Sequence, residues 1–148
     1  MIRRPPRSTQ GVSSAASDVY KRQLQNTEIL VAVLPSTVAT IGLIDACLLA
    51  RLPRGAFIIN VGRGDLIREG DLLRALDREH LAGAALDVFS QEPLPVGHPF
   101  WRHPRVSITP HVASTTQADT AVGHVVTNIG RWQAGQPLGH VADLEQGY

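Results

Sequence analysis

The stretch that decides the fold is residues 56–64, AFIINVGRG, in which an apolar run ends in a glycine, an arginine and a second glycine. The run 56–61 is short and, apart from Asn60, apolar, as expected of a β-strand that is buried on both faces. Three further runs of this kind lie at 28–34 (EILVAVL), 84–88 (AALDV) and 106–109 (VSIT). These four segments are therefore predicted to be strands of one sheet.

Helical patterns separate the predicted strands. Asp45 is expected to cap one helix and Asp71 to open another, and leucines at helical spacing follow each aspartate. Strands that alternate with helices indicate βαβ units, and hence an α/β fold with a parallel sheet covered on both sides. Cys47, in the first helix, is expected to be a small buried apolar residue, because a single cysteine is a poor metal ligand.

Composition limits the possible partners without naming one. The 148 residues carry 14 Lys+Arg and 13 Asp+Glu, a formal net charge of +1, and are 43% hydrophobic. This balance does not indicate binding to nucleic acid or to a membrane surface. No run of about 18 apolar residues predicts a spanning helix, so a soluble protein of the reducing cytoplasm is expected.

The two ends of the chain differ in composition from its centre. Residues 1–23 are rich in Arg and Ser, are expected to be disordered, and resemble translated sequencing-adapter read-through. A basic address, a nucleic-acid-binding arm or a transit peptide are the alternative interpretations of RRPPR and its surroundings. Residues 114–117 have the form of a capping box, and apolar residues from Val122 to Trp132 then continue at helical spacing.

Ligands of parallel α/β sheets bind at the carboxyl ends of the strands, so the residues that follow each apolar run are the candidate site. Arg63 stands between glycines that let the backbone approach a ligand closely, and its planar guanidinium suits a carboxylate. His111 is the only one of the six histidines at a strand end. Glu92 is either solvated or reaches inward to His111. Any one of these residues alone would more often be a surface group, but their joint position favours a functional site.

Three motifs carry a family resemblance. The runs 34–67 (LPSTVATIGLIDACLLARLPRGAFIINVGRGDLI), 83–95 (GAALDVFSQEPLP) and 98–114 (HPFWRHPRVSITPHVAS) resemble the D-isomer-specific 2-hydroxyacid dehydrogenases. The resemblance extends from about Leu24 to Tyr148, and within the family it is strongest to glyoxylate/hydroxypyruvate reductases. It implies a Rossmann-like dinucleotide-binding domain, of which residues 24–113 are a part, and a C-terminal helix and tail at 114–148 that belong to the substrate domain.

The resemblance also implies roles for single residues. Arg63 would hold the substrate carboxylate, His111 would be the catalytic acid/base and Glu92 would orient it. An imidazole paired with a carboxylate keeps its proton to higher pH, which suits the reduction of a carbonyl group. The implied cofactor-binding residues are Leu34, Pro35, Val61, Gly62 and Asp87, with Asp87 at the nicotinamide end. Gly62 replaces an alanine of many relatives, a change expected to do little harm.

The implied activity is hydride transfer between NAD(P)H, with NADPH favoured, and a small 2-oxoacid such as glyoxylate or hydroxypyruvate, in a homodimer. The chain contains no GxGxxG motif, which holds the pyrophosphate in this fold. We therefore expect an incomplete domain that is inactive alone. The alternatives are a non-catalytic binding module of the dehydrogenase-like corepressor type, an inactive fragment, or a relative of phosphoglycerate or formate dehydrogenase.

Overall fold

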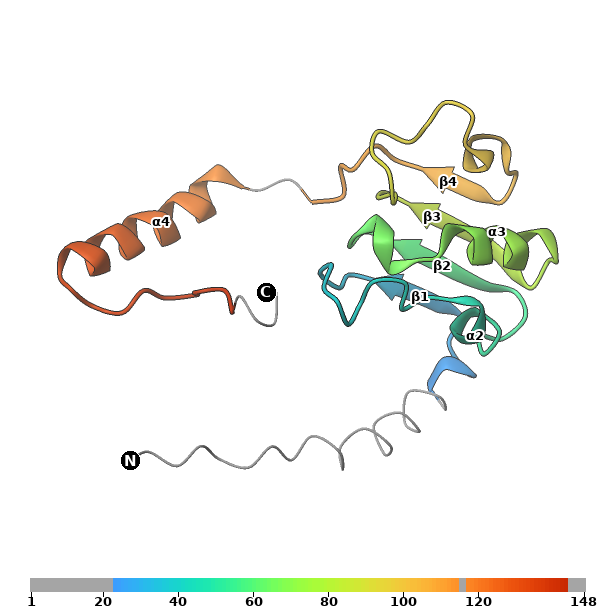
Figure 1. Cartoon of the computed structure of the whole chain (residues 1–148), viewed down its shortest axis with the longest axis horizontal. Helices are drawn as coiled ribbons and strands as arrows, with labels where there is room; N and C mark the ends of the chain where they lie inside the picture. Colours follow the sequence, from blue (N-terminus) through green and yellow to red (C-terminus); the bar gives the residue numbers. More distant parts are fainter. Residues whose placement is uncertain (1–22, 115–116, 144–148) are drawn as a thin grey trace.

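A parallel four-stranded sheet organises the protein (Figure 1). The computed structural model describes residues 23–114 and 117–143. The strands lie in the order of the sequence, and all four predicted strands are confirmed, although each is shorter or shifted by a few residues. Their bounds are β1 (Ile29–Ala32), β2 (Ala56–Asn60), β3 (Leu81–Leu86) and β4 (Val106–Ile108). The predicted α/β class is confirmed.

Two helices connect the first three strands, α2 (Ala46–Leu49) and α3 (Glu69–Asp77). Asp45 caps α2 as predicted, because its carboxylate accepts a hydrogen bond of 2.9 Å from the backbone N–H of Leu48. The predicted start of α3 at Asp71 is wrong, since that helix begins at Glu69. The Asp71 carboxylate instead accepts a 3.0 Å hydrogen bond from the N–H of Ala46, so it ties α3 to the first turn of α2.

The helices cover one face of the sheet, and the expectation that both faces are covered is wrong for the described residues. On β2, Ile58 and Asn60 are buried under the helices, whereas Phe57 on the opposite face is 45% exposed. The strand order explains this difference. Successive right-handed crossovers that run in one direction across a parallel sheet place every connecting helix on the same side.

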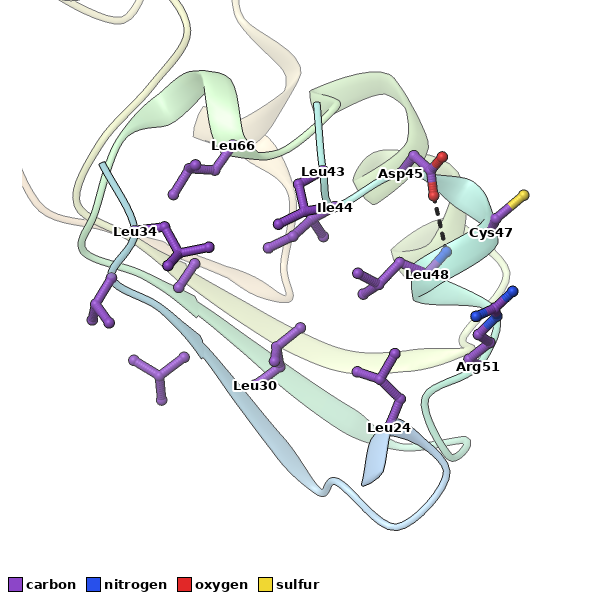
Figure 2. A pocket seen from close by; sticks show the side chains of 13 residues that line it. Leu24, Leu30, Leu34, Leu43, Ile44, Asp45, Cys47, Leu48, Arg51 and Leu66 are labelled. Atoms are coloured by element: carbon purple, nitrogen blue, oxygen red, sulfur yellow. Dashed lines mark hydrogen bonds between the residues drawn. The ribbon is translucent and has the colours of Figure 1, made fainter. Parts of the chain in front are cut away.

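The free edge of β1 borders an apolar groove of about 750 Å³ between β1, α2 and the segment 43–45 (Figure 2). Among the described residues β1 pairs only with β2, and Val31 on this strand is 48% exposed. Cys47 lies at the rim of the groove and is exposed, so the prediction that it is buried is wrong. Helix α2 is only four residues long, and it turns Leu49, rather than Cys47, toward the core.

The predicted C-terminal helix is confirmed as α4 (Ala118–Gln133), which lies apart from the sheet (Figure 1). Its apolar stripe is open to solvent, with side chains between 49% and 71% exposed at Val122, Val125, Val126, Ile129 and Trp132. Residues 115 and 116 of the predicted capping box, and residues 1–22, lie outside the described residues. The adapter-like origin of 1–23 and the boundary at 113/114 stay predictions. No helix of the described residues has the length and apolar content to cross a membrane.

The open edge of β1 predicts that the purified chain self-associates. Unpaired backbone groups on an apolar edge strand pair readily with another chain, and a charged side chain on the edge opposes this. We expect light scattering to give a mass well above the 16.0 kDa of one chain, and Val31→Lys to lower it. Val96→Lys, at a 97% exposed loop position, is the matched control and should change nothing. A monodisperse monomer without substitution would contradict this prediction.

Candidate active site

The four strand ends bring the candidate residues to one edge of the sheet. Because the strands are parallel, the segments that follow them all emerge at the same side. Glu92 comes from the loop after β3 and His111 from the turn after β4. The Nδ1 atom of His111 lies 2.8 Å from Oε2 of Glu92. Of the two alternatives for Glu92, solvated or turned toward His111, the structure shows the second.

Two hydrogen bonds hold the Glu92 carboxylate in place. Oε2 is bonded to His111, and Oε1 accepts a 2.9 Å bond from the N–H of Phe89. The hydrogen bond to His111 is the main cause of a lowered pKa of Glu92, and the Phe89 bond and the nearby charges of His111 and Arg63 act in the same direction. Glu92 therefore stays ionised, and its bond to Nδ1 leaves Nε2 of His111 as the ring nitrogen available to a substrate.

Asp87 holds the turn that carries His111. Its carboxylate accepts hydrogen bonds of 2.9 Å from the N–H groups of Val112 and Ala113 and a further bond from the Thr109 hydroxyl, while its backbone carbonyl accepts the N–H of His111 at 2.8 Å. Burial opposes the charge of Asp87, but these bonds outweigh it and keep its pKa below the usual value. His111 has a φ of 55°, a left-handed conformation that is rare outside glycine and that this network fixes.

Arg63 is exposed at the carboxyl end of β2. It is positioned by Asn60, a residue that the sequence did not reveal. Asn60 is buried, its amide nitrogen donates to the carbonyl of Arg63 at 2.9 Å, and its amide oxygen accepts the N–H of Gly62 at 3.1 Å. A polar side chain at the end of an apolar run was the available signal. The guanidinium donates to the carbonyl of Gly62 at 2.7 Å and otherwise extends outward.

The glycines beside Arg63 serve packing within the protein. A Cβ on Gly64 would lie 1.9 Å from the carbonyl carbon of Phe89, which no side chain permits, and a Cβ on Gly62 would lie 2.9 Å from the carbonyl oxygen of Leu34. The two glycines leave space for the loops after β3 and β1, and so bring the segment of Arg63 against the loop that carries Glu92. Close approach of a ligand to the backbone at these glycines stays a prediction.

Three of the five predicted cofactor-binding residues, Leu34, Val61 and Asp87, border two hollows. Val61 and Asp87 line a groove of about 290 Å³ on the open face of the sheet, together with Val112 and Ala113. Leu34 lines the groove beside β1 and lies against Gly62. The carbonyl of Pro35 accepts the Thr40 hydroxyl at 2.6 Å, which fixes the loop after β1. A third cavity of about 430 Å³ is bounded by Glu92, His111, Trp101 and apolar neighbours.

Comparison with known proteins decides the family. The sequence profile described as "D-isomer specific 2-hydroxyacid dehydrogenase, NAD binding domain" matches residues 3–113. The chain belongs to this family. The family resemblance of the three motifs is thereby confirmed, whereas the individual roles of Arg63, Glu92 and His111 stay predictions.

Relatives in the family include reductases and structures that contain NADP(H). The chain is 42% identical over 146 residues to glyoxylate/hydroxypyruvate reductase A of Salmonella typhimurium. The matched region is 98% of this chain and 47% of the relative. A Xanthobacter autotrophicus 2-hydroxyacid dehydrogenase in complex with NADPH is 46% identical, with a TM-score of 0.84, over 88% of this chain and 42% of that one. An NADPH-dependent glyoxylate/hydroxypyruvate reductase from Sinorhizobium meliloti, in complex with NADP, is 38% identical with a TM-score of 0.83, over 99% and 48%. The chain thus spans about half the length of these relatives.

The buried charge of Asp87 predicts a pH-dependent stability. Because its folded pKa is lowered, its contribution is complete above the unfolded pKa of about 3.9 and is lost as the pH falls through the folded value. Asp87→Asn should lower the free energy of unfolding at pH 7 by about 1–3 kcal/mol and weaken its decline below pH 4. Urea unfolding at several pH values measures both effects. Asp77→Asn, at a 68% exposed side chain, is the control, and equal losses in both variants would contradict the prediction.

Proposed function

We propose that this chain forms the catalytic and nicotinamide-facing part of an NAD(P)H-dependent reductase of small 2-oxoacids such as glyoxylate or hydroxypyruvate. The observation that carries the proposal is the 2.8 Å contact between His111 and Glu92, at the strand ends that also present Arg63. An acid/base and a cation for a carboxylate are the two groups that reduction of a 2-oxoacid requires of the protein. The names of the relatives support the same substrate class.

In this proposal each residue has a defined task. Arg63 binds the carboxylate of the 2-oxoacid through its planar fork and so orients the neighbouring carbonyl group. His111 gives a proton from Nε2 to the carbonyl oxygen, and Glu92, bonded to Nδ1, keeps the ring in the right orientation. A bound nicotinamide would supply the hydride to the carbonyl carbon.

The proposed cofactor is NADPH, in keeping with the complexes of the relatives. The open groove along Val61 and Asp87 fits a flat nicotinamide ring, because its walls are mostly apolar and it ends at the turn of His111. Leu34, Pro35 and Gly62 would lie along the rest of the cofactor. The Asp87 carboxylate already accepts three hydrogen bonds, so its contribution at the nicotinamide end is to shape the groove as well as to offer an acceptor.

The wider setting is proposed from the family resemblance: a cytoplasmic homodimer that binds a small molecule and neither nucleic acid nor membrane. A chimera tests the activity, with residues 24–148 joined to the N-terminal half of the Salmonella reductase. We expect it to reduce glyoxylate with NADPH and the 148-residue chain alone to be inactive. A folded chimera that binds NADPH but reduces neither glyoxylate nor hydroxypyruvate would refute the proposal and favour a non-catalytic binding module of the corepressor type.

Arg63→Lys in this chimera should impair use of the oxoacid far more than binding of NADPH. A lysine keeps the charge but cannot form the two parallel hydrogen bonds of a guanidinium to a carboxylate. We expect kcat/KM for glyoxylate to fall by about 10²-fold, which corresponds to a loss of about 2.7 kcal/mol of transition-state binding. Arg54→Lys, on the loop before β2, is the control. An unchanged kcat/KM in Arg63→Lys would remove this residue from the site.

Substitution of the acid/base pair should separate its two members. His111→Ala removes the proton donor, and turnover should fall by about 10²- to 10⁴-fold. Glu92→Gln should cost less, because the proton donor on His111 remains and only the charge-assisted hydrogen bond that orients its ring is weakened. Initial rates with glyoxylate measure both effects. Equal losses in the two variants, or an unchanged turnover in Glu92→Gln, would contradict the pairing.

A further inference from the structure

Glu69, the first residue of α3, contacts the loop that carries Glu92. Its Oε1 accepts a 2.9 Å hydrogen bond from the backbone N–H of Ser90, and its Oε2 lies 3.4 Å from Nε2 of His98. The side chain of Glu69 is 22% exposed. One carboxylate therefore links the start of α3 to two positions in the chain between β3 and β4.

The tautomer of His98 suits this contact. Its Nδ1 accepts the N–H of Phe100 at 3.3 Å, so in the neutral ring the hydrogen lies on Nε2, which faces Glu69. The His98 ring also packs against the buried ring of Phe100, with the ring centres 4.6 Å apart. Packing against the core therefore fixes the imidazole of His98. This ring is a second partner for the Glu69 carboxylate, at the oxygen that does not bind Ser90.

The segment 63–69 touches the loop after β3 at both of its ends. Gly64 lies directly against the backbone of Phe89, and Glu69 holds the N–H of Ser90. The N–H of Phe89 in turn holds the carboxylate of Glu92. A shift of Ser90 away from α3 would therefore move Phe89 and, with it, the oxygen atoms that Glu92 presents to His111.

We propose that Glu69 is a positioning residue, which fixes the loop after β3 through Ser90 so that Glu92 meets His111. The significance of this role for reduction rests on the proposed function, but the geometry can be tested without it. Glu69 lies in the first turn of α3, where its side chain can accept the N–H of Ser90 from outside the helix. The role requires the reach of a glutamate and an acceptor oxygen at its end.

Three substitutions at Glu69 separate reach from charge. Glu69→Ala removes the acceptor, Glu69→Asp keeps the charge but is one methylene too short to reach Ser90, and Glu69→Gln keeps the reach and an acceptor oxygen. Asp77→Ala is the matched control, because Asp77 lies at the other end of α3 and faces His103, close to the start of β4, at the same 3.4 Å. Glu69→Asp also keeps the helix start charged, so it tests the idea if Glu69→Ala does not fold.

The measurements use the full 148-residue chain. Selective ¹³C labelling of glutamate carboxyl carbons gives few signals, so Glu92 can be titrated without overlap, and hydrogen exchange reports on Ser90. In Glu69→Ala and Glu69→Asp we expect the lowered pKa of Glu92 to rise toward its usual value and the Ser90 amide to exchange about tenfold faster. Glu69→Gln should largely restore both values, and Asp77→Ala should change neither.

An unchanged Glu92 titration in a folded Glu69→Asp or Glu69→Ala chain would overturn the proposal, as would equal shifts in Asp77→Ala. Neither the Glu92 titration nor the Ser90 amide exchange measures an activity. Failure of this proposal is therefore distinct from failure of the proposed function, which an inactive, folded chimera would show. In an active chimera, Glu69→Asp should lower kcat for glyoxylate and leave the KM for NADPH nearly unchanged. The matching Asp77→Ala chimera should keep the parent kcat.

Discussion

The candidate site depends on the hydrogen bonds of the buried Asp87 carboxylate. This carboxylate joins the end of β3 to the turn after β4 by accepting hydrogen bonds from Thr109, Val112 and Ala113. A charge removed from water is costly unless its hydrogen bonds are made, and here they lie within the protein. The same network holds His111 in a left-handed conformation that its backbone would not otherwise favour. The position of the imidazole is therefore set by a group that need not take part in the chemistry.

A second constraint is the close contact between the loops that follow β2 and β3. Gly64 against Phe89 leaves no space for a side chain, and Asn60 closes the turn that presents Arg63. The candidate groups lie on loops, but each loop is fastened to a strand end by a buried polar side chain or by direct backbone packing. A rigid sheet with short, fastened loops can hold Arg63, Glu92 and His111 in a defined arrangement before a ligand binds.

The sequence predicted what depends on neighbours along the chain. The four strands follow from apolar runs, and the helix cap follows from Asp45, whose partner Leu48 lies only three residues further along the chain. The sequence predicted less well the features that depend on distant contacts. Asp71 accepts a hydrogen bond from a residue of α2 that lies 25 positions earlier, and Cys47 faces outward because its helix is short. Local pattern also left the Glu92–His111 contact open, because 19 residues separate the partners. Glu69 escaped notice because its hydrogen-bond partner is a backbone N–H 21 residues away, at Ser90. Asn60 offered only one signal, a polar residue at the end of an apolar run.

The hydrogen bonds that place the three candidate groups all lie between Asn60 and Ala113, and none of them involves the free edge of β1 or helix α4. Apolar surface is exposed at that edge, on the open face of the sheet and on α4. The arrangement of Glu92 and His111 is therefore a local property of these loops, whereas the proposed function would also require these surfaces to be covered around a cofactor and substrate. Because exclusion of water strengthens every electrostatic interaction in a site, the geometry of the pair is separable from its proposed catalytic use.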